Sequence, residues 1–434
     1  MARDARGAAG LWWLAAIGGL LSCASTSGWA GALPAECQAP GSHEAGSVAV
    51  ETRAEEDGLP VFNLFVSESL PDEERDYQAR LVYRGRCLPV QLRFRGDTSR
   101  HFPKRSYTLD FSRDAPFDEP LLAEGFTGRR KVVLVSPFND NSYLRHRLAF
   151  TLWNRMAPDH IQVKTFSAIV YVNGRYMGLY AVVDHLNAHL LAAQGLDRDG
   201  DLFKADGDDA NFSRLTYETH EPKRYLHQGF EKKAGIPESG PGAHDSIAAF
   251  TAFVADSGPE RFRVERDAWM EAREYEDWWI FATLVTANDS VAKNAYHYRA
   301  RGGRWRPIPW DLDASFGQNW DTRRNEPEDR TTYASRNRLF ARMLEDPAIA
   351  GPLRERYRVL LQGELRAEVV LGLIDQYARE IAPAARRDEV HWRQQYLDFF
   401  RWRTRTDFTT FDEEVEYLRR WVRQRWSALE SQRP

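Results

Sequence analysis

Two segments of the chain have the residue types and spacing that metal-dependent chemistry requires. Asp289 and Asn294 are five positions apart in Asp-Ser-Val-Ala-Lys-Asn, and Asp311 and Asp313 are two positions apart after a short apolar run. Carboxylate and amide oxygens are the ligands that hard divalent cations prefer, and a carboxylate can also accept the proton of a hydroxyl group. The four residues therefore indicate either metal-assisted group transfer to a hydroxyl or an acidic pocket in a large soluble domain.

Protein kinases use the same order of parts. A catalytic-loop aspartate is followed five residues later by a metal-ligating asparagine, and then by a separate metal-binding aspartate near a Phe-Gly pair. A Phe-Gly pair follows Asp313 here, although not directly. On this interpretation Asp289 is the catalytic carboxylate that positions the acceptor hydroxyl. The metal ligands are then Asn294, Asp311 and Asp313, with Asp311 as the principal carboxylate.

Local geometry offers two further expectations for these residues. Alternate positions of an extended strand face the same way, so Asp311 and Asp313 could share one metal. The alternative for Asp289 and Asn294 is an ordinary pair of caps at a helix end, because Asx side chains favour such turns.

The elements that must position these residues begin with a β-rich part, from about residue 58 to 184. Short β-branched or alternating runs predict strands at residues 61–66, 79–83, 90–94, 106–111, 131–135, 168–172 and 177–183. One helix interrupts them, with Ser142 as its expected cap and apolar residues at four-residue spacing up to Met156. Asn173-Gly174, between the last two strands, predicts a hairpin.

Helices dominate the rest of the chain. Apolar spacing and charge pairs predict helices over residues 278–286, 337–362, 365–382 and 411–430. Residues 205–245 are polar and glycine-rich, so they form either a long loop or an ordered insertion. We therefore predict an α+β fold with a β-rich lobe at 58–184 and a mainly helical lobe at 185–434, which carries the catalytic and metal motifs.

The N-terminus resembles an export signal. Two arginines precede an apolar core at residues 11–21, and Ala30-Gly31-Ala32 is a small-residue cleavage site. We expect a signal peptide at 1–32, a leader at 33–57 and an exported protein, periplasmic or extracellular. The alternative is a lipoprotein signal that anchors the protein to the membrane through Cys23. No other segment approaches the length that a membrane span requires.

Cleavage of that signal would leave two of the three cysteines, Cys37 and Cys87. In an oxidising compartment a lone pair of cysteines is expected to form a disulfide, which would tether the mature N-terminus to an early strand. Two unrelated thiols are the alternative.

Composition and the absence of other motifs narrow the function. Apolar residues make up 43% of the 434 residues, so the chain can build a sizeable core, and the net charge of −4 gives no footprint for nucleic-acid binding. The histidines form no zinc motif, and the sequence has neither a Walker loop nor a G-x-S-x-G elbow. These absences argue against P-loop and hydrolase functions.

Several motifs, in order along the chain, resemble one family. The segments Arg-Gly-Asp-Thr-Ser-Arg and Pro-Lys-Arg-Ser-Tyr are similar to the R-G-N-S-S and P-K-K-S-Y signature of the CotH kinase family, the spore-coat protein H type. An Asn-Gly hairpin, a Phe-Lys-Ala segment and the two acidic segments complete the resemblance. The matching segments are residues 95–107, 173–180, 203–205, 289–294 and 309–317. The resemblance implies an atypical protein-kinase-like fold and, in some members, phosphorylation of proteins with ATP and a divalent metal.

The cationic residues of these motifs fit phosphoryl transfer, which needs positive charge to hold the phosphates. Arg95, Arg100 and Lys104 cluster at a strand end, and Lys104 is the expected phosphate-contacting lysine, with a solvated basic strand as the alternative. Lys204 is a further candidate for nucleotide contact. Asp184 stands where the family usually has Glu and is a candidate partner for the lysine, although it is one methylene shorter.

These inferences predict an exported, CotH-type protein kinase. It would transfer the γ-phosphate of ATP to Ser, Thr or Tyr hydroxyls of a protein, with Mg or Mn as the metal. The scarcity of ATP outside the cytoplasm favours a second hypothesis, a non-catalytic surface or matrix protein that binds a cell-wall component or another partner on the same fold. The acidic residues argue against this second hypothesis, because a binding protein has no need of them.

Overall fold

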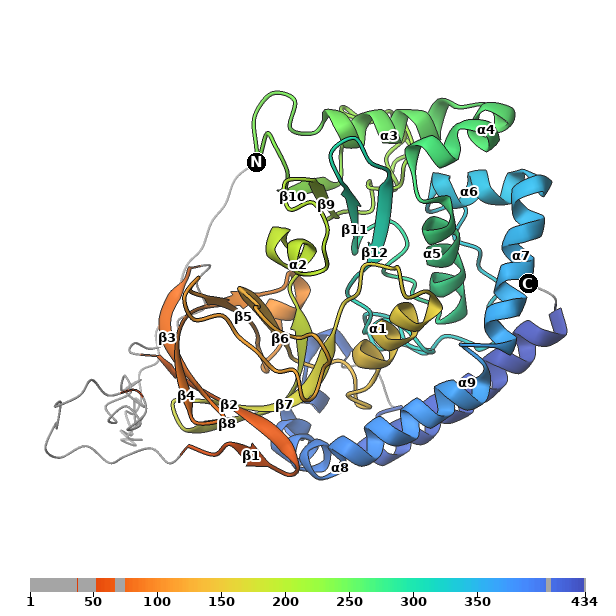
Figure 1. Ribbon diagram of the computed structural model, residues 1–434. Helices are drawn as coiled ribbons and strands as arrows, with labels where there is room; N and C mark the ends of the chain where they lie inside the picture. Colours follow the sequence, from red (N-terminus) through yellow and green to blue (C-terminus); the bar gives the residue numbers. More distant parts are fainter. Residues whose placement is uncertain (1–36, 38–51, 67–74, 403–406, 433–434) are drawn as a thin grey trace, which may run out of the picture.

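The computed structural model describes residues 37, 52–66, 75–402 and 407–432 (Figure 1). The predicted signal peptide, the alternative lipid site at Cys23 and most of the leader lie outside these residues. Strands and helices both occur, so the predicted α+β class is confirmed. No helix in the described part of the chain is long and apolar enough to cross a membrane.

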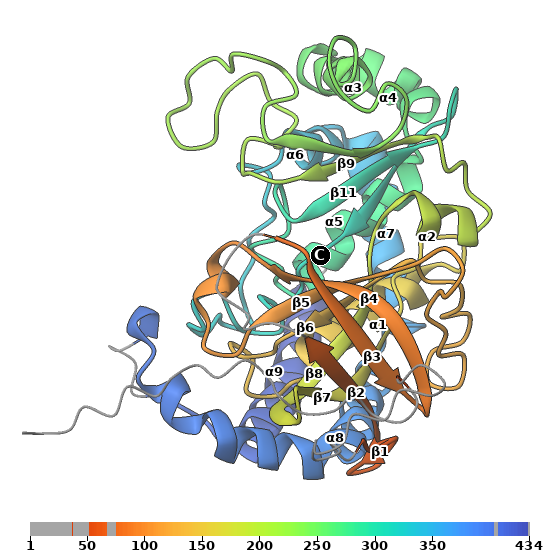
Figure 2. The ribbon, with the colours of Figure 1, turned by 90° about the vertical axis from the view of Figure 1, so that its left-hand side faces the viewer.

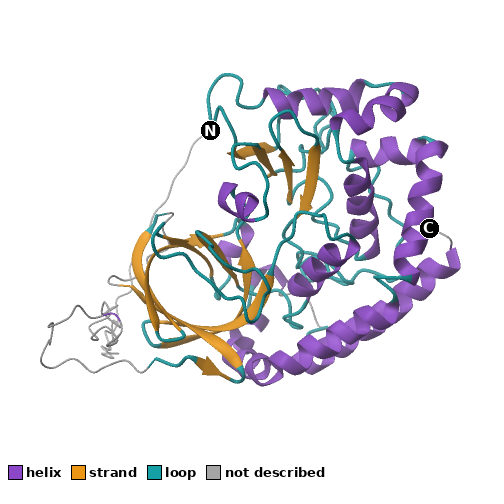
Figure 3. Cartoon of the chain, in the orientation of Figure 1, coloured by secondary structure: helices purple, strands orange, loops and turns teal. Residues whose placement is uncertain are grey.

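The β-rich part is a closed barrel. Its strands are β2 (Leu59–Val66), β3 (Tyr77–Tyr83), β4 (Arg86–Arg95), β5 (Ser106–Phe111), β6 (Lys131–Val135), β7 (Thr165–Val172) and β8 (Arg175–Asp184). They pair in the order β2-β3-β4-β5-β6-β8-β7, and a parallel pairing of β7 with β2 closes the ring (Figure 3). A two-residue strand, β1 (Glu55–Glu56), pairs with β2. The seven predicted strands are confirmed. The closure of these strands into a barrel was not predicted from their sequence patterns.

Alternation along the strands separates two hydrophobic clusters. In β8, Tyr180 and Val182 point into the barrel cluster, whereas Leu179, Ala181 and Val183 belong to a larger cluster outside it. This is the two-residue period of a strand that is buried on both faces. The helices that cover the outer face are α1 (Arg145–Met156), which contacts β7, and α8 (Ala367–Leu397), which contacts β2 and β8.

A second sheet follows the barrel in sequence. It has the order β10 (Phe230–Ala234), β9 (Asp201–Ala205), β11 (Ala295–Arg299) and β12 (Trp305–Pro309), all antiparallel. Figures 1 and 2 both show it between the barrel and helices α3 (Asp245–Asp256) and α4 (Pro259–Trp269). Residues 205–245 are therefore an ordered insertion that contributes β10, one of the two alternatives left open by the sequence.

Helix α5 (Ala272–Leu284) packs against β12, and every residue on it except Arg273 is buried. The other helices are α2 (Ala188–Ala193), α6 (Arg338–Glu345), α7 (Pro347–Gln362) and α9 (Phe411–Gln432). The predicted helix at 337–362 is two helices, because Asp346 caps α7 and Pro347 begins it. Proline is favoured at the first position of a helix but cannot donate the hydrogen bond that would continue α6.

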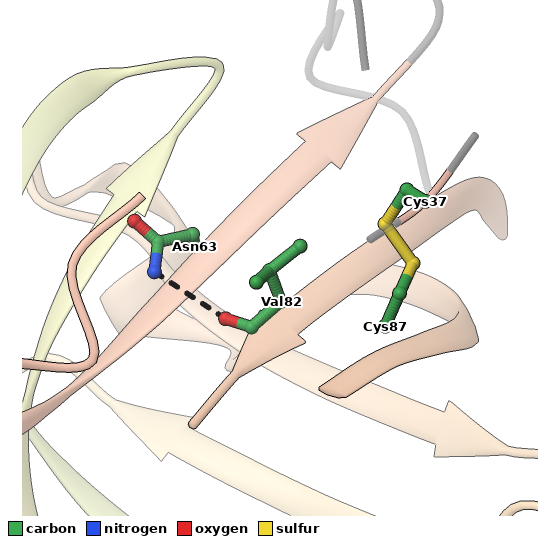
Figure 4. Close-up of a disulfide and its surroundings, with 4 residues drawn as sticks. All are labelled: Cys37, Asn63, Val82 and Cys87. Atoms are coloured by element: carbon green, nitrogen blue, oxygen red, sulfur yellow. Dashed lines mark hydrogen bonds between the residues drawn. A yellow bond between two sulfur atoms is a disulfide. The ribbon is translucent and has the colours of Figure 1, made fainter. Parts of the chain in front are cut away.

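The predicted disulfide is present. Cys37 and Cys87 are bonded with a Cα–Cα distance of 5.4 Å, beside the pairing of β2 with β3, where Asn63 donates a hydrogen bond to the carbonyl of Val82 (Figure 4). Cys37 packs on Phe65 and Val82 and is buried. Cys37 is thus linked covalently to strand β4 of the barrel.

We expect the bond to be formed in the mature protein and to contribute to stability. Because it closes a loop of 50 residues, replacing both cysteines with serine should lower the free energy of unfolding by about 2–4 kcal/mol. Mass spectrometry of protein alkylated without reduction checks the bond, and urea unfolding checks the energy. Two freely alkylated thiols would contradict the prediction.

Candidate functional site

Two loops from distant parts of the chain are bonded to each other at the acidic motifs. The hydroxyl of Ser290 donates to the carbonyl of Trp310 at 2.8 Å and to that of Asp311 at 3.1 Å. The backbone N–H of Trp310 donates to the carbonyl of Asn294 at 3.0 Å. The loop after α5 is therefore held against the turn after β12, and the two acidic motifs share one site.

The backbone of the site is strained. Asn294 (φ 56°) and Asp311 (φ 58°) are in the left-handed region, and so are the nearby Thr286 (φ 52°) and Phe316 (φ 48°). Each such residue costs on the order of 1–3 kcal/mol and persists only where the surroundings hold it. The surroundings do so here, for example through the N–H of Asn294, which donates to the carbonyl of Ala205 at 2.8 Å.

Asp311 and Asp313 do not lie at alternate positions of one extended strand, as the sequence predicted. Strand β12 ends at Pro309, and a turn follows it. The two carboxylates therefore converge because Asp311 reverses the backbone, not because they alternate along a strand.

Asp289 is held by two neighbours of its own motif. The ammonium of Lys293 lies 3.1 Å from Oδ1, and the side-chain amide of Asn294 donates to Oδ2 at 2.9 Å. Partial burial raises the pKa of Asp289 to about 6; Lys293 opposes this shift, while the carboxylates of Asp311 and Asp208 add to it. The group therefore carries its charge at pH 7 and has a pKa in the range that suits a general base.

Asp313 is held on the other side of the site. Its Oδ2 accepts a hydrogen bond of 2.5 Å from Asn139, and its Oδ1 accepts one of 3.0 Å from the N–H of Ala314. Burial raises the pKa of Asp313 to about 8, and the charges of Asp311 and Asp289 contribute to that rise. The three carboxylates thus repel one another, which is the electrostatic condition that a bound cation would relieve.

The first turn of α1 brings residues to the site that the sequence did not indicate. His146, Asp311 and Asp313 each offer one potential metal-ligand atom, and these three atoms all lie within 4.8 Å of one another. Burial lowers the pKa of His146 to about 4, so its ring is neutral at pH 7. The available signal was the polar run Asn139-Asp140-Asn141-Ser142, of which only Ser142 was interpreted, as a helix cap.

That polar run also changes how α1 begins. The predicted cap, Ser142, does not hold that position: Leu144 precedes the helix, and the carboxylate of Asp140 accepts hydrogen bonds from the N–H groups of Ser142 and Arg145, at 3.0 and 2.9 Å. The buried guanidinium of Arg145 binds Asp140 at 2.6 Å and Glu414 of α9 at 2.5 Å. It also donates to the carbonyl of Ser315 at 3.1 Å, which fixes the turn of Asp313 against α1.

Arg95 reaches the site from the end of β4. Its guanidinium lies 5.8 Å from the ring centre of Trp310, and its charge lowers the pKa of His146. Within the described residues no carboxylate forms an ion pair with it. Arg100 lies in the 3₁₀ turn Thr98–His101 that follows β4, and Lys204 of β9 forms an ion pair with Asp206.

Lys104 and Asp184 are not partners. Lys104 is 1% exposed, and its ammonium donates at 2.6 Å both to Asp388 of α8 and to the carbonyl of Leu179. Asp184 binds Arg129 at 2.6 Å. Leu179 and Asp184 are five residues apart on β8, roughly 17 Å along a strand, so one lysine cannot reach both.

Asp311 is the exposed carboxylate of the site, whereas Asp289 and Asp313 are half-buried and His146 is buried. Neither of the two cavities described includes an acidic motif residue. A cavity of about 20 Å³ beside Lys104 has room for about one water molecule. A larger one of about 500 Å³ lies among α5, α6, α7 and α9.

Fold and site together define an α+β protein in which a strand-end arginine, a helix-borne histidine and carboxylates from two loops meet at one acidic surface. A family model described as CotH kinase protein matches residues 92–429, which is most of the chain. The chain therefore belongs to the CotH kinase protein family. It is similar to inner spore coat protein H of Bacillus subtilis (strain 168), with 27% identity over 318 residues that cover 71% of this chain and 82% of that protein.

Proposed function

We propose that the protein is an exported, metal-dependent kinase that transfers the γ-phosphate of ATP to a Ser, Thr or Tyr hydroxyl of a protein. The observation that carries the proposal is the convergence of Asp289, Asn294 and the Asp311–Asp313 turn at one site. Phosphoryl transfer needs a carboxylate at the acceptor and a metal at the phosphates, in separate places. The two acidic motifs supply these two functions from two different loops.

Asp289 is the residue that receives the acceptor hydroxyl. Its pKa of about 6 lets it accept a proton at neutral pH. Lys293 and Asn294 each bind one of its oxygens, so the carboxylate is oriented before any substrate arrives. Such orientation lowers the cost of reaching the reactive geometry.

Asp311 and Asp313, with the side-chain amide oxygen of Asn294, are the residues that would hold Mg²⁺ or Mn²⁺. Their mutual repulsion and the raised pKa of Asp313 fit a cation at this place. The metal supplies charge neutralisation for the phosphates. Arg95, which has no carboxylate partner among the described residues, is the cation best placed to bind a phosphate; Lys204 is engaged by Asp206, and Arg100 lies in the turn after β4.

The arrangement of the chain is consistent with a two-lobe kinase. In this interpretation the barrel is the first lobe, and the second sheet with its helices is the other. Arg95 comes from the barrel, while both acidic motifs come from the second part. Asp184 and Lys104 then act within the first lobe as structural groups, and Lys104 could contact a phosphate only if α8 moved away from it.

A second function has one observation in its favour. The similar Bacillus subtilis protein is named as a spore coat component, and Asp311 of the acidic site is exposed in this chain. A non-catalytic surface or matrix protein on the same fold would bind such a partner without transferring phosphate.

Label transfer from γ-labelled ATP tests the two functions. With Mn²⁺ or Mg²⁺ we expect label on the protein itself or on an added generic protein such as casein, and we expect ATP with metal to raise the melting temperature. The Asp289→Ala variant is the control for contaminating kinases. If the wild type shows neither transfer nor a nucleotide-dependent thermal shift with any metal, the kinase proposal fails and the binding function takes its place.

A further inference from the structure

We propose that His146 is a nitrogen ligand of the metal at this site and that the site therefore prefers Mn²⁺ to Mg²⁺. The proposal rests on the acidic site described above and deepens the proposed function by assigning its metal. It does not require that phosphate is transferred.

The position of His146 carries the first part of the argument. The residue is 7% exposed and lies in the first turn of α1, with one of its ligand atoms within 4.8 Å of ligand atoms of Asp311 and Asp313. Two ligands of one ion are at most about 4.4 Å apart, because each bond is about 2.2 Å long. The three side chains thus need to contract by only a few tenths of an ångström to share an ion.

The unused hydrogen-bonding capacity of the ring carries the second part. Neither Nδ1 nor Nε2 of His146 has a hydrogen-bond partner among the described residues, although both atoms are buried. An unsatisfied buried polar group costs about 1–3 kcal/mol, so it requires a reason. Its neighbours are the ring of Phe150, which lies edge-on at 5.0 Å, the carboxylates of Asp311 and Asp140, and the guanidinium of Arg95. A metal ion between the ring and the two carboxylates would use one of these nitrogens.

The chemistry of the ligand set gives the preference. Mg²⁺ is bound almost entirely by oxygen. Mn²⁺ shares the preference of Mg²⁺ for carboxylate oxygen, but it is also the first member of the transition-metal series that binds mixed nitrogen and oxygen sites. Of these two metals, Mn²⁺ is therefore better matched to a site of one imidazole and two carboxylates. A site with oxygen ligands alone would not make this distinction.

Metal titration of the mature, metal-free protein without ATP tests the proposal. We expect Mn²⁺ to bind at least about tenfold more tightly than Mg²⁺. Mn²⁺ binding is measured by the loss of the free-ion signal in electron paramagnetic resonance, and Mg²⁺ binding is measured by competition with Mn²⁺. The His146→Phe variant keeps the ring contact with Phe150 and removes the ligand. It should lose Mn²⁺ affinity by about tenfold or more and change Mg²⁺ affinity much less. The His146→Asn variant keeps an oxygen ligand and should narrow the difference between the two metals.

Two controls keep the test decisive. The His244→Ala variant removes one member of a stacked histidine pair on another part of the molecule, His227 and His244, and should leave Mn²⁺ affinity unchanged. If His146→Phe does not fold, the nitrogen coupling of bound Mn²⁺ in pulsed resonance spectra of the wild type answers the same question. Absence of that coupling, or equal Mn²⁺ affinity of wild type and His146→Phe, overturns the proposal. If Mn²⁺ binding depends on His146 but no label is transferred, the proposed kinase function is overturned and the proposed metal ligand stands.

Discussion

The Asp289→Ala variant is expected to lose phosphoryl transfer by roughly 10²- to 10⁴-fold while remaining folded, because a positioned general base contributes about that much to the rate. Its free energy of unfolding should change by less than about 1 kcal/mol. Partial burial and the charges of Asp311 and Asp208 already disfavour the Asp289 carboxylate. Their relief offsets the loss of its contacts with Lys293 and Asn294.

Label transfer and thermal unfolding, measured on the same preparation, check both parts of this expectation. Asp197→Ala is the matched control, since Asp197 is 23% exposed and paired with Arg301, much as Asp289 is 19% exposed and paired with Lys293. Asp197 lies just before β9, at the opposite end of that strand from the acidic motifs. An Asp289→Ala protein with wild-type transfer would remove this residue from the mechanism.

The Lys104→Ala variant is expected to be strongly destabilised, by about 3–5 kcal/mol, because it leaves the buried carboxylate of Asp388 without its partner. The double variant Lys104→Met, Asp388→Asn should recover most of that loss. It removes both charges, and the asparagine oxygen can still accept the hydrogen bond that Asp388 accepts from the N–H of Leu179 at 2.7 Å.

Urea unfolding of the single and double variants measures both changes. Lys131→Ala is the control, because Lys131 and Asp110 form a partly exposed ion pair on the barrel, and its loss should cost no more than about 1 kcal/mol. The family resemblance makes a different prediction for Lys104, namely weaker nucleotide binding in a stable protein. That result would show that α8 moves and that Lys104 is a phosphate contact.

The sequence predicted the barrel strands well because each of them has a short, strongly periodic pattern. The hairpin at Asn173-Gly174 was equally clear, since both residues have the positive φ that the turn requires. Barrel closure was not predictable in the same way. It depends on the parallel pairing of β2 with β7, which joins residues more than a hundred positions apart, such as Val61 and Ile169.

The second sheet was missed for a physical reason as well. Its strands are five residues long and lie among helices, and β10 has the charged sequence Phe-Glu-Lys-Lys-Ala. The extended conformation of such a strand depends on its pairing with a neighbouring strand more than on its own amino-acid composition.

At the site, the acidic residues were identifiable because their spacing carries the chemistry. The partner of Lys104 and the closeness of His146 to Asp311 and Asp313 depend on how α8 and α1 pack. Local sequence patterns do not predict this packing.

The ion pair between Lys104 and Asp388 has a consequence for the order in which the chain can mature. The two residues are separated by 284 positions. At 5–20 residues per second, a ribosome needs roughly 15–60 s to synthesise the chain between these two residues. The last barrel strand, β8, ends at Asp184, so for the final 204 of these positions (388 − 184) every barrel strand has been made while the lysine beneath α8 has no counter-charge. The outer face of the barrel therefore stays uncovered until nearly the whole polypeptide has been synthesised, and a product that terminates before α8 would expose both the apolar outer side of β8 and an unpaired Lys104.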